Sequence, residues 1–87
     1  MSLLEPSELF REVVDASGVA PVLAPGTVRR ALRDVGSTPQ TASTKIYLQA
    51  LPSIRARLRA FMSPEEAGVA IDRIRNVLAS AGDEQSA

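Results

Sequence analysis

The sequence predicts an all-α protein, a compact bundle of four to five short helices without strands. Apolar residues recur three and four positions apart in several segments, which is the spacing of one helix face. Residues typical of helix ends, namely Gly, Pro, Ser and Thr, separate these segments. No segment alternates apolar and polar residues as a half-buried strand would. Together these observations favour helices packed on one another.

The length and the composition limit this fold to one small domain. The chain has 87 residues, of which 45% are hydrophobic but only 3% aromatic, so small aliphatic side chains must build the core. We expect a single helical domain over residues 1–82 and a disordered polar tail over residues 83–87. A domain of this size buries little more than about 60% of its unfolded surface, so modest stability is expected.

The first expected helix spans about residues 7–17. Its apolar stripe consists of Leu9, Phe10, Val13, Val14 and Ser17. Gly18 follows, and glycine readily adopts the left-handed conformation that ends a helix. The next segment, VAPVLAPG over residues 19–26, is too apolar for a free linker, so we expect it to pack beneath the helices. The residues expected to do so are Val19, Val22 and Leu23. The alternative is that this apolar loop is a docking surface.

A short second helix is expected over residues 28–35. Thr27 precedes it as a potential N-cap, and Gly36 follows its last apolar residue. Its apolar stripe consists of Val28, Ala31, Leu32 and Val35. Three arginines, Arg29, Arg30 and Arg33, occupy the other face.

Pro52 decides how many helices follow. A third helix is expected to begin at Pro39 with Thr38 as its cap. Its apolar pattern reaches Pro52, and a proline inside a helix costs about 3 kcal/mol or more. We therefore expect a break there and a fourth helix over residues 53–61. The alternative is one long helix over residues 39–62, kinked at Pro52.

The last expected helix has the clearest start signal. Ser63 and Glu66 occupy the N-cap and N3 positions of a capping box, and Pro64 stands at the first helical position. This helix should end near Ser80, before Gly82. The expected core of the whole bundle comprises Phe10, Val14, Leu32, Ile46, Leu51, Ile54, Leu58, Phe61, Ile71, Ile74 and Leu78.

Positive charge is concentrated in the middle of the chain. Residues 28–62 carry seven basic residues against one acid, Asp34, a net charge of +6, although the whole chain is neutral. The predicted partner-binding residues are Arg29, Arg30, Arg33, Lys45, Arg55 and Arg59. Arg57 is expected on the opposite side of its helix from Arg55 and Arg59. A single basic surface therefore requires the helices over 28–35 and 53–61 to lie side by side.

Little in the sequence indicates catalysis. The chain has neither Cys nor His, which excludes disulfides and thiolate metal sites and removes the usual general base. A serine would have to be activated by Lys45, the only lysine, which is a weak signal. We therefore predict no enzyme, no catalytic or metal site, no cofactor and no small-molecule substrate.

The favoured function is a non-enzymatic protein–protein interaction domain, of the adaptor or regulatory kind. Its partner would be another protein or a second copy, because the basic middle of one chain could meet the acidic ends of another. The alternative is a nucleic-acid-binding, helix-turn-helix-like domain that uses residues 28–62, with residues 39–51 as its recognition helix. The sequence pI of about 6.2 favours the first, because dedicated nucleic-acid binders commonly exceed about 9.

The expected location is the cytoplasm. No run of apolar residues approaches the ~18 to 20 that span a membrane. The first ten residues, MSLLEPSELF, lack the basic and apolar regions of a signal peptide. The richness in Ala, Arg, Val and Gly is typical of a GC-rich bacterial genome.

Overall fold

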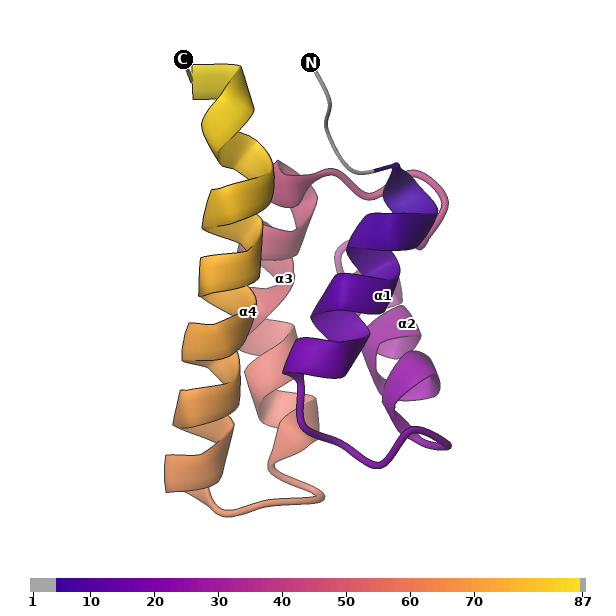
Figure 1. Ribbon diagram of the computed structural model, residues 1–87. Helices are drawn as coiled ribbons and strands as arrows, with labels where there is room; N and C mark the ends of the chain where they lie inside the picture. The colour runs from indigo at the N-terminus through magenta and orange to yellow at the C-terminus, as the bar shows by residue number, and fades with distance from the viewer. Residues whose placement is uncertain (1–4, 87) are drawn as a thin grey trace.

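Four antiparallel helices form the fold (Figure 1). The computed structural model describes the backbone of residues 5–86 and the side chains of residues 5–81. The helices are α1 (Pro6–Ala16), α2 (Ala24–Asp34), α3 (Thr44–Leu58) and α4 (Pro64–Ser86). Over this part of the chain no strand occurs, which confirms the predicted all-helical bundle. None of its helices is both long enough and apolar enough to cross a membrane.

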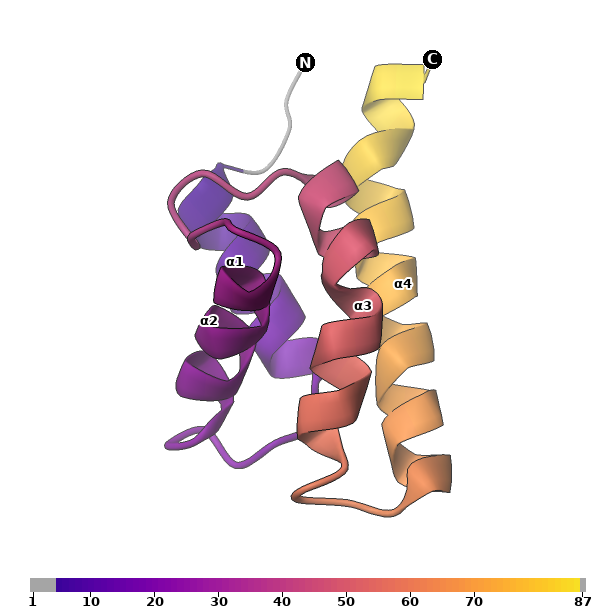
Figure 2. The same cartoon turned by 180° about the vertical axis from the view of Figure 1, so that it is seen from behind.

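The helices pack in a ring of four. α1 packs on α2, α2 on α3, α3 on α4, and α4 on α1. The bundle therefore has two layers, one of α1 and α4 in front in Figure 1 and one of α2 and α3 in front in Figure 2. α1 and α3 lie at diagonal corners.

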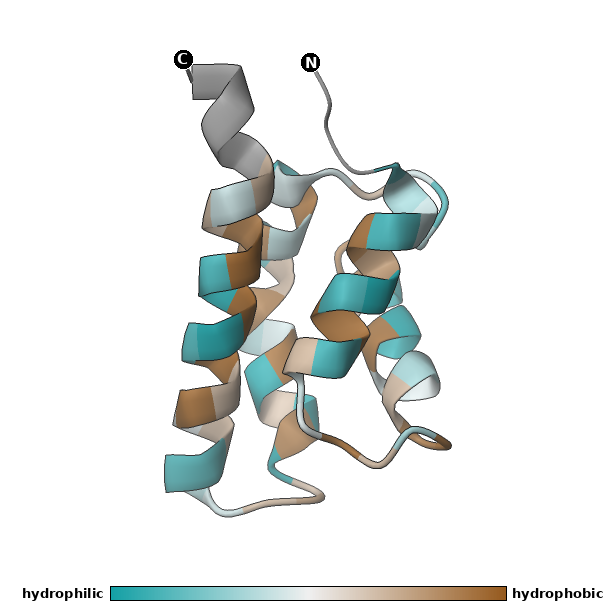
Figure 3. Cartoon of the chain, in the orientation of Figure 1, coloured by the Kyte–Doolittle hydropathy of each residue, from teal (hydrophilic) through white to brown (hydrophobic). Residues whose placement is uncertain are grey.

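One hydrophobic core lies between these layers. Along α4 the hydrophobic residues lie mostly on the side turned toward α1 and α3 (Figure 3). Of the expected core, the buried members are Leu32, Leu51, Ile54, Leu58, Ile71, Ile74 and Leu78, and the partly buried ones are Phe10, Val14 and Ile46. The prediction for Phe61 is wrong: its side chain is 46% exposed, because α3 ends before it at Leu58.

α2 begins four residues earlier than the sequence indicates. It starts at Ala24, so Thr27 is not its cap; the Thr27 hydroxyl instead donates to the carbonyl of Leu23 at 2.9 Å, inside the helix. Pro25 is accepted because the first turn of a helix does not use its backbone N–H groups. The preceding loop packs only through Val19, which is partly buried. The predicted burial of two further residues is wrong, since Val22 is 90% exposed and Leu23 is 48% exposed.

α3 is one continuous helix through Pro52, so the predicted break is wrong and the single-helix alternative is the better description. The proline lies on the exposed side, where the Leu48 carbonyl that loses its donor faces solvent. The start of α3 also differs from the prediction. Thr38 does not cap it, because its carbonyl closes a separate turn by accepting from the N–H of Ala42 at 2.9 Å. The cap is Ser43.

α4 begins as predicted. The Ser63 hydroxyl accepts from the N–H of Glu66 at 3.1 Å, and the Glu66 carboxylate accepts from the N–H of Ser63 at 2.9 Å. The predicted end near Ser80 is wrong, because the helix continues through Gly82 to Ser86. The division into a domain over 1–82 and a tail over 83–87 stays a prediction; Ala87 lies outside the described residues.

Candidate interaction surface

The layer of α2 and α3 carries all six predicted partner-binding residues. The two helices pack side by side (Figure 2). Arg57 points from α3 to α2, so Arg55 and Arg59, on the opposite side of α3, lie on its flank away from α2. Every one of the six side chains is exposed. We call the exposed outer surface of this layer the basic face; its residues are Arg29, Arg30 and Arg33 on α2, Lys45 and Arg55 on α3, and Arg59 directly after α3.

A hydrogen-bonded ion pair joins the two helices within this face. Arg57 of α3 donates from Nε and Nη2 to the two carboxylate oxygens of Asp34 at the end of α2, each at 2.9 Å. The Ser53 hydroxyl donates to the same carboxylate. The hydrogen bonds from Arg57 and then Ser53 lower the pKa of Asp34 from its ordinary 3.8 to about 2. Arg57 thus holds α3 against α2, and the charges of Arg57 and Asp34 cancel each other.

At the edge of the basic face next to α1, Arg29 contacts an aromatic ring. The guanidinium carbon of Arg29 lies 5.9 Å from the centre of the Phe10 ring. At this distance the cation is attracted to the face of the ring, by about 0.5–1 kcal/mol at an exposed site. Arg29 is therefore held beside α1, at the edge of the basic face that is farthest from α4.

The two layers carry opposite charge. The α2–α3 layer, counted with Arg59 directly after α3, has seven basic residues and one acid, a net charge of +6. Over residues 5–81 the α1–α4 layer has three basic residues and seven acids, a net charge of −4. The alternation of charge along the chain thus becomes a separation of charge across the bundle.

An apolar residue, Leu48, lies among the cations of α3, and the sequence analysis did not single it out. Its side chain is 48% exposed. Its position in the sequence could have indicated this exposure. Leu48 stands next to the buried Tyr47 and outside the apolar stripe that Tyr47 forms with Leu51 and Ile54. Leu48 gives the basic face a hydrophobic contact beside its charges.

The link between α2 and α3 lacks the form of a helix-turn-helix. It runs over residues 35–43, longer than the expected three-residue link over 36–38. Two hydroxyls of this link, those of Thr38 and Thr41, bond to each other at 2.9 Å. A third, that of Ser43, accepts from the N–H of Ile46 as the cap of α3.

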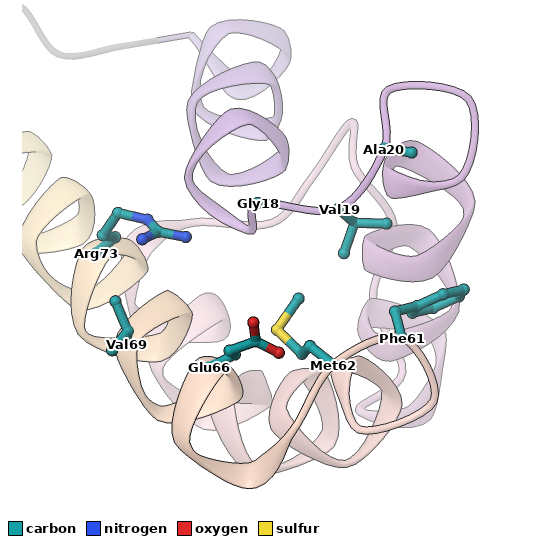
Figure 4. Close-up of a pocket in the computed structure, with 8 residues that line it drawn as sticks. All are labelled: Gly18, Val19, Ala20, Phe61, Met62, Glu66, Val69 and Arg73. Carbon is teal, nitrogen blue, oxygen red and sulfur yellow. The ribbon is translucent and has the colours of Figure 1, made fainter.

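A second feature is a groove where the loops of the bundle meet (Figure 4). We call it the loop-end groove; its volume is about 500 Å³. It lies between the α1–α2 loop, the turn after α3, and the first half of α4. The residues that line it are Gly18, Val19, Ala20, Phe61, Met62, Glu66, Val69 and Arg73. The sequence analysis assigned no site here, although it left the α1–α2 loop open as a docking surface.

The acid at each surface already has a partner within the chain. Within the described residues, no three His, Cys, Asp or Glu side chains are grouped as metal ligands. Glu66 is engaged in the cap of α4, and Asp34 is held by Arg57. The arrangement offers two possible modes of binding. The α2–α3 layer offers charge, and the loop-end groove offers apolar contact. No family model, curated protein or solved structure compared with this chain matches it.

Proposed function

We propose that this protein is a non-enzymatic interaction domain that binds an acidic surface of another protein through its basic face. The observation that carries the proposal is the presence of six exposed cations in one layer of the bundle, five of them on two adjacent helices and Arg59 directly after α3. The Arg57–Asp34 bonds fix the spacing between those helices, so the charges are preorganised. Leu48 supplies the apolar contact that a purely electrostatic surface lacks.

A second copy of the chain is a poor occupant for this face. Its complement on another copy would be the acidic α1–α4 layer, which lies on the opposite side of the bundle. Contact between two different faces is heterologous, and such contacts grow into open chains unless their rotation closes a ring. A partner of a different kind avoids this outcome, so we propose an acidic helix or an acidic protein surface.

Nucleic acid is the weaker candidate. The sequence pI of about 6.2 lies well below the value of about 9 that dedicated nucleic-acid binders commonly exceed. Three hydroxyls in and next to the α2–α3 link, those of Thr38, Thr41 and Ser43, already bond within the chain. These observations support a protein partner, and the following experiment includes duplex DNA as a rival ligand.

The test is a binding titration with defined probes. The first is a designed amphipathic helix of about three heptads, with Leu on one side and Glu around it. Its control is the same helix with Lys in place of Glu. We expect the Glu helix to bind with a Kd that rises at least about fivefold in Arg55→Glu/Arg59→Glu, because each exposed ion pair contributes up to about 1 kcal/mol. Binding of the Lys helix to the acidic α1–α4 layer should not be weakened by these substitutions. Arg11→Glu on α1 is the matched control and should bind like the unaltered protein.

Failure of the Glu helix to bind would overturn the proposal, as would equal affinity of the Arg55→Glu/Arg59→Glu and Arg11→Glu variants for it. The rival is tested with a random duplex at about 50 and about 200 mM salt. Duplex binding that weakens steeply with salt and is lost in Arg29→Ala/Arg30→Ala would favour the nucleic-acid function instead.

A further inference from the structure

The loop end of the bundle exposes most of the large hydrophobic side chains that are not buried. Within the described residues these are Val22, Leu23, Leu48, Phe61 and Val69. All except Leu48 belong to the α1–α2 loop, the turn after α3 or the first half of α4. Exposed apolar side chains gathered at one place, rather than scattered singly, typically mark a contact surface.

The loop-end groove gives this surface a shape. Val19 from the α1–α2 loop and Met62 from the turn after α3 point toward one another across it (Figure 4). Phe61 forms one end of the groove, and Val69 lines it from α4 with its side chain 54% exposed. The groove therefore has apolar side chains at several points along its length, with room for side chains from outside.

Two opposite charges accompany these apolar residues. Glu66 lies by the middle of the groove and Arg73 at the end away from Phe61 (Figure 4). They are seven positions apart on α4, so about 10 Å of helix separates them. Arg73 donates from Nε to the carbonyl of Ala16 at 3.1 Å, which anchors the guanidinium beside the loop. No ion pair joins Arg73 to Glu66 in the described part of the chain.

We infer that the occupant of the loop-end groove is the loop end of a second copy, in a two-fold symmetric dimer. A two-fold axis between positions 66 and 73 places Glu66 of each copy opposite Arg73 of the other. The groove is thus complementary in charge to itself, and Phe61 and Val69 of each copy cover apolar surface of the other. The net charge of zero adds no overall repulsion between copies.

The proposed dimer contact differs from a contact in which the basic face of one copy binds the acidic layer of another. The same surface is used on both copies, so the assembly closes at two chains. It leaves the α2–α3 layer free, and the inference therefore stands or falls independently of the proposed function.

The first test measures the mass in solution by sedimentation equilibrium, from about 10 µM to about 1 mM protein. The expected average mass rises from the 9.2 kDa of the monomer toward twice that value and no further. Val69→Lys and Phe61→Lys should each remain at the monomer mass. Leu48→Lys is the matched control, because Leu48 is exposed to a similar extent but lies on α3, and it should dimerise normally.

The second test exchanges the charges. Glu66→Arg places like charges opposite each other in the dimer, and so does Arg73→Glu, so each variant alone should stay monomeric. When the two are mixed, both opposed pairs become attractive again, and a heterodimer should form. A circular dichroism melt of each variant shows that it is folded, since Glu66 and Arg73 also stabilise helix ends.

Three results would overturn the inference. The first is a mass of 9.2 kDa at every concentration. The second is dimerisation that persists in both Val69→Lys and Phe61→Lys. The third is a mixture of folded Glu66→Arg and Arg73→Glu that remains monomeric. A mass that grows beyond two chains would also contradict it, because it indicates heterologous contacts.

Discussion

The guanidinium of Arg57 and the carboxylate of Asp34, 23 positions apart in the chain, meet through two hydrogen bonds of 2.9 Å. Asp34 ends α2 and Arg57 belongs to the last turn of α3, so this pair joins the two helices that carry the basic face. A fork of two parallel bonds fixes orientation as well as distance. The pair therefore contributes both to the stability of the bundle and to the geometry of the proposed binding surface.

The stability of the protein should decrease at acidic pH because Asp34 becomes protonated. Because Arg57 and Ser53 hold the pKa of Asp34 at about 2, below its ordinary 3.8, this carboxylate stabilises the fold fully above pH 3.8. The contribution is lost as the pH falls from 3.8 to about 2. Urea unfolding of the protein and of Asp34→Asn should give midpoints that differ at neutral pH and converge toward pH 2. A gap that stays constant over this range would show that the charge of Asp34 is not responsible.

Tyr47→Phe should stabilise the protein. The Tyr47 side chain is fully buried, and its hydroxyl has no hydrogen-bond partner among the described residues. A buried polar group without a partner costs about 1–3 kcal/mol, which phenylalanine removes without leaving a large cavity. The expected gain in the free energy of unfolding is about 1 kcal/mol, measured by urea denaturation. A loss of stability would indicate that the hydroxyl is satisfied in solution.

The same residue should make the protein sensitive to alkali. Burial raises the pKa of Tyr47 above its ordinary 10, so the unfolded chain loses this proton at a lower pH than the folded chain. Stability should therefore be complete below pH 10 and fall above it, and Tyr47→Phe should abolish this fall. Tyr47 is the only tyrosine, so its tyrosinate absorbance reports it alone. The absorbance should appear together with the loss of helical circular dichroism; its appearance in the folded protein would contradict the prediction.

Gly18 and Gly36 offer a matched pair of substitutions. Both have positive φ angles, +74° and +78°, so alanine at either position should cost about 1–2 kcal/mol of backbone strain. A Cβ at Gly18 would also lie 2.7 Å from Nη2 of Arg73, whereas one at Gly36 meets nothing within 4 Å. Gly18→Ala should therefore destabilise more than Gly36→Ala, by thermal melts. In an Arg73→Ala background the two costs should become equal; a difference that persists would place its cause elsewhere.

Pro52→Ala should stabilise α3. The substitution restores an N–H donor for the Leu48 carbonyl and removes the clash of the ring with the preceding turn, an interior cost of about 3 kcal/mol. The unfolded chain gains freedom worth up to about 1 kcal/mol, so the net gain should be at most about 2 kcal/mol. Urea denaturation measures it. A loss of stability would show that the packing of α3 on its neighbours depends on the bend that the proline imposes.

The sequence predicted those features that depend on neighbouring residues. The Ser63–Glu66 capping box is confirmed because its two bonds join residues three positions apart. The helical spacing likewise placed Leu32, Ile54 and Ile74 in the core. Pro52 was misread because its local cost is outweighed by packing of the whole helix, since residues on both sides of it, Leu51 and Ile54, are buried.

The candidate surfaces depend on contacts that the sequence does not reveal. Spacing along each helix predicted which arginines would be exposed, but only the packing of α2 on α3 brings them to one layer. The partners of Arg57 and Arg73, namely Asp34 and the Ala16 carbonyl, lie 23 and 57 positions away. The exposure of Val22 was unpredictable for the same reason, because an apolar loop residue is buried only if another element covers it.

The opposite charges of the two layers also make this neutral protein a strong permanent dipole. Its moment points from the α1–α4 side to the α2–α3 side, across the narrow dimension of the bundle. In the field of any anionic body the molecule turns before contact, so it arrives with α2 and α3 leading and with fewer unproductive encounters. The same asymmetry should let it adsorb to both cation- and anion-exchange resins near neutral pH, through opposite sides, which a net charge of zero does not suggest.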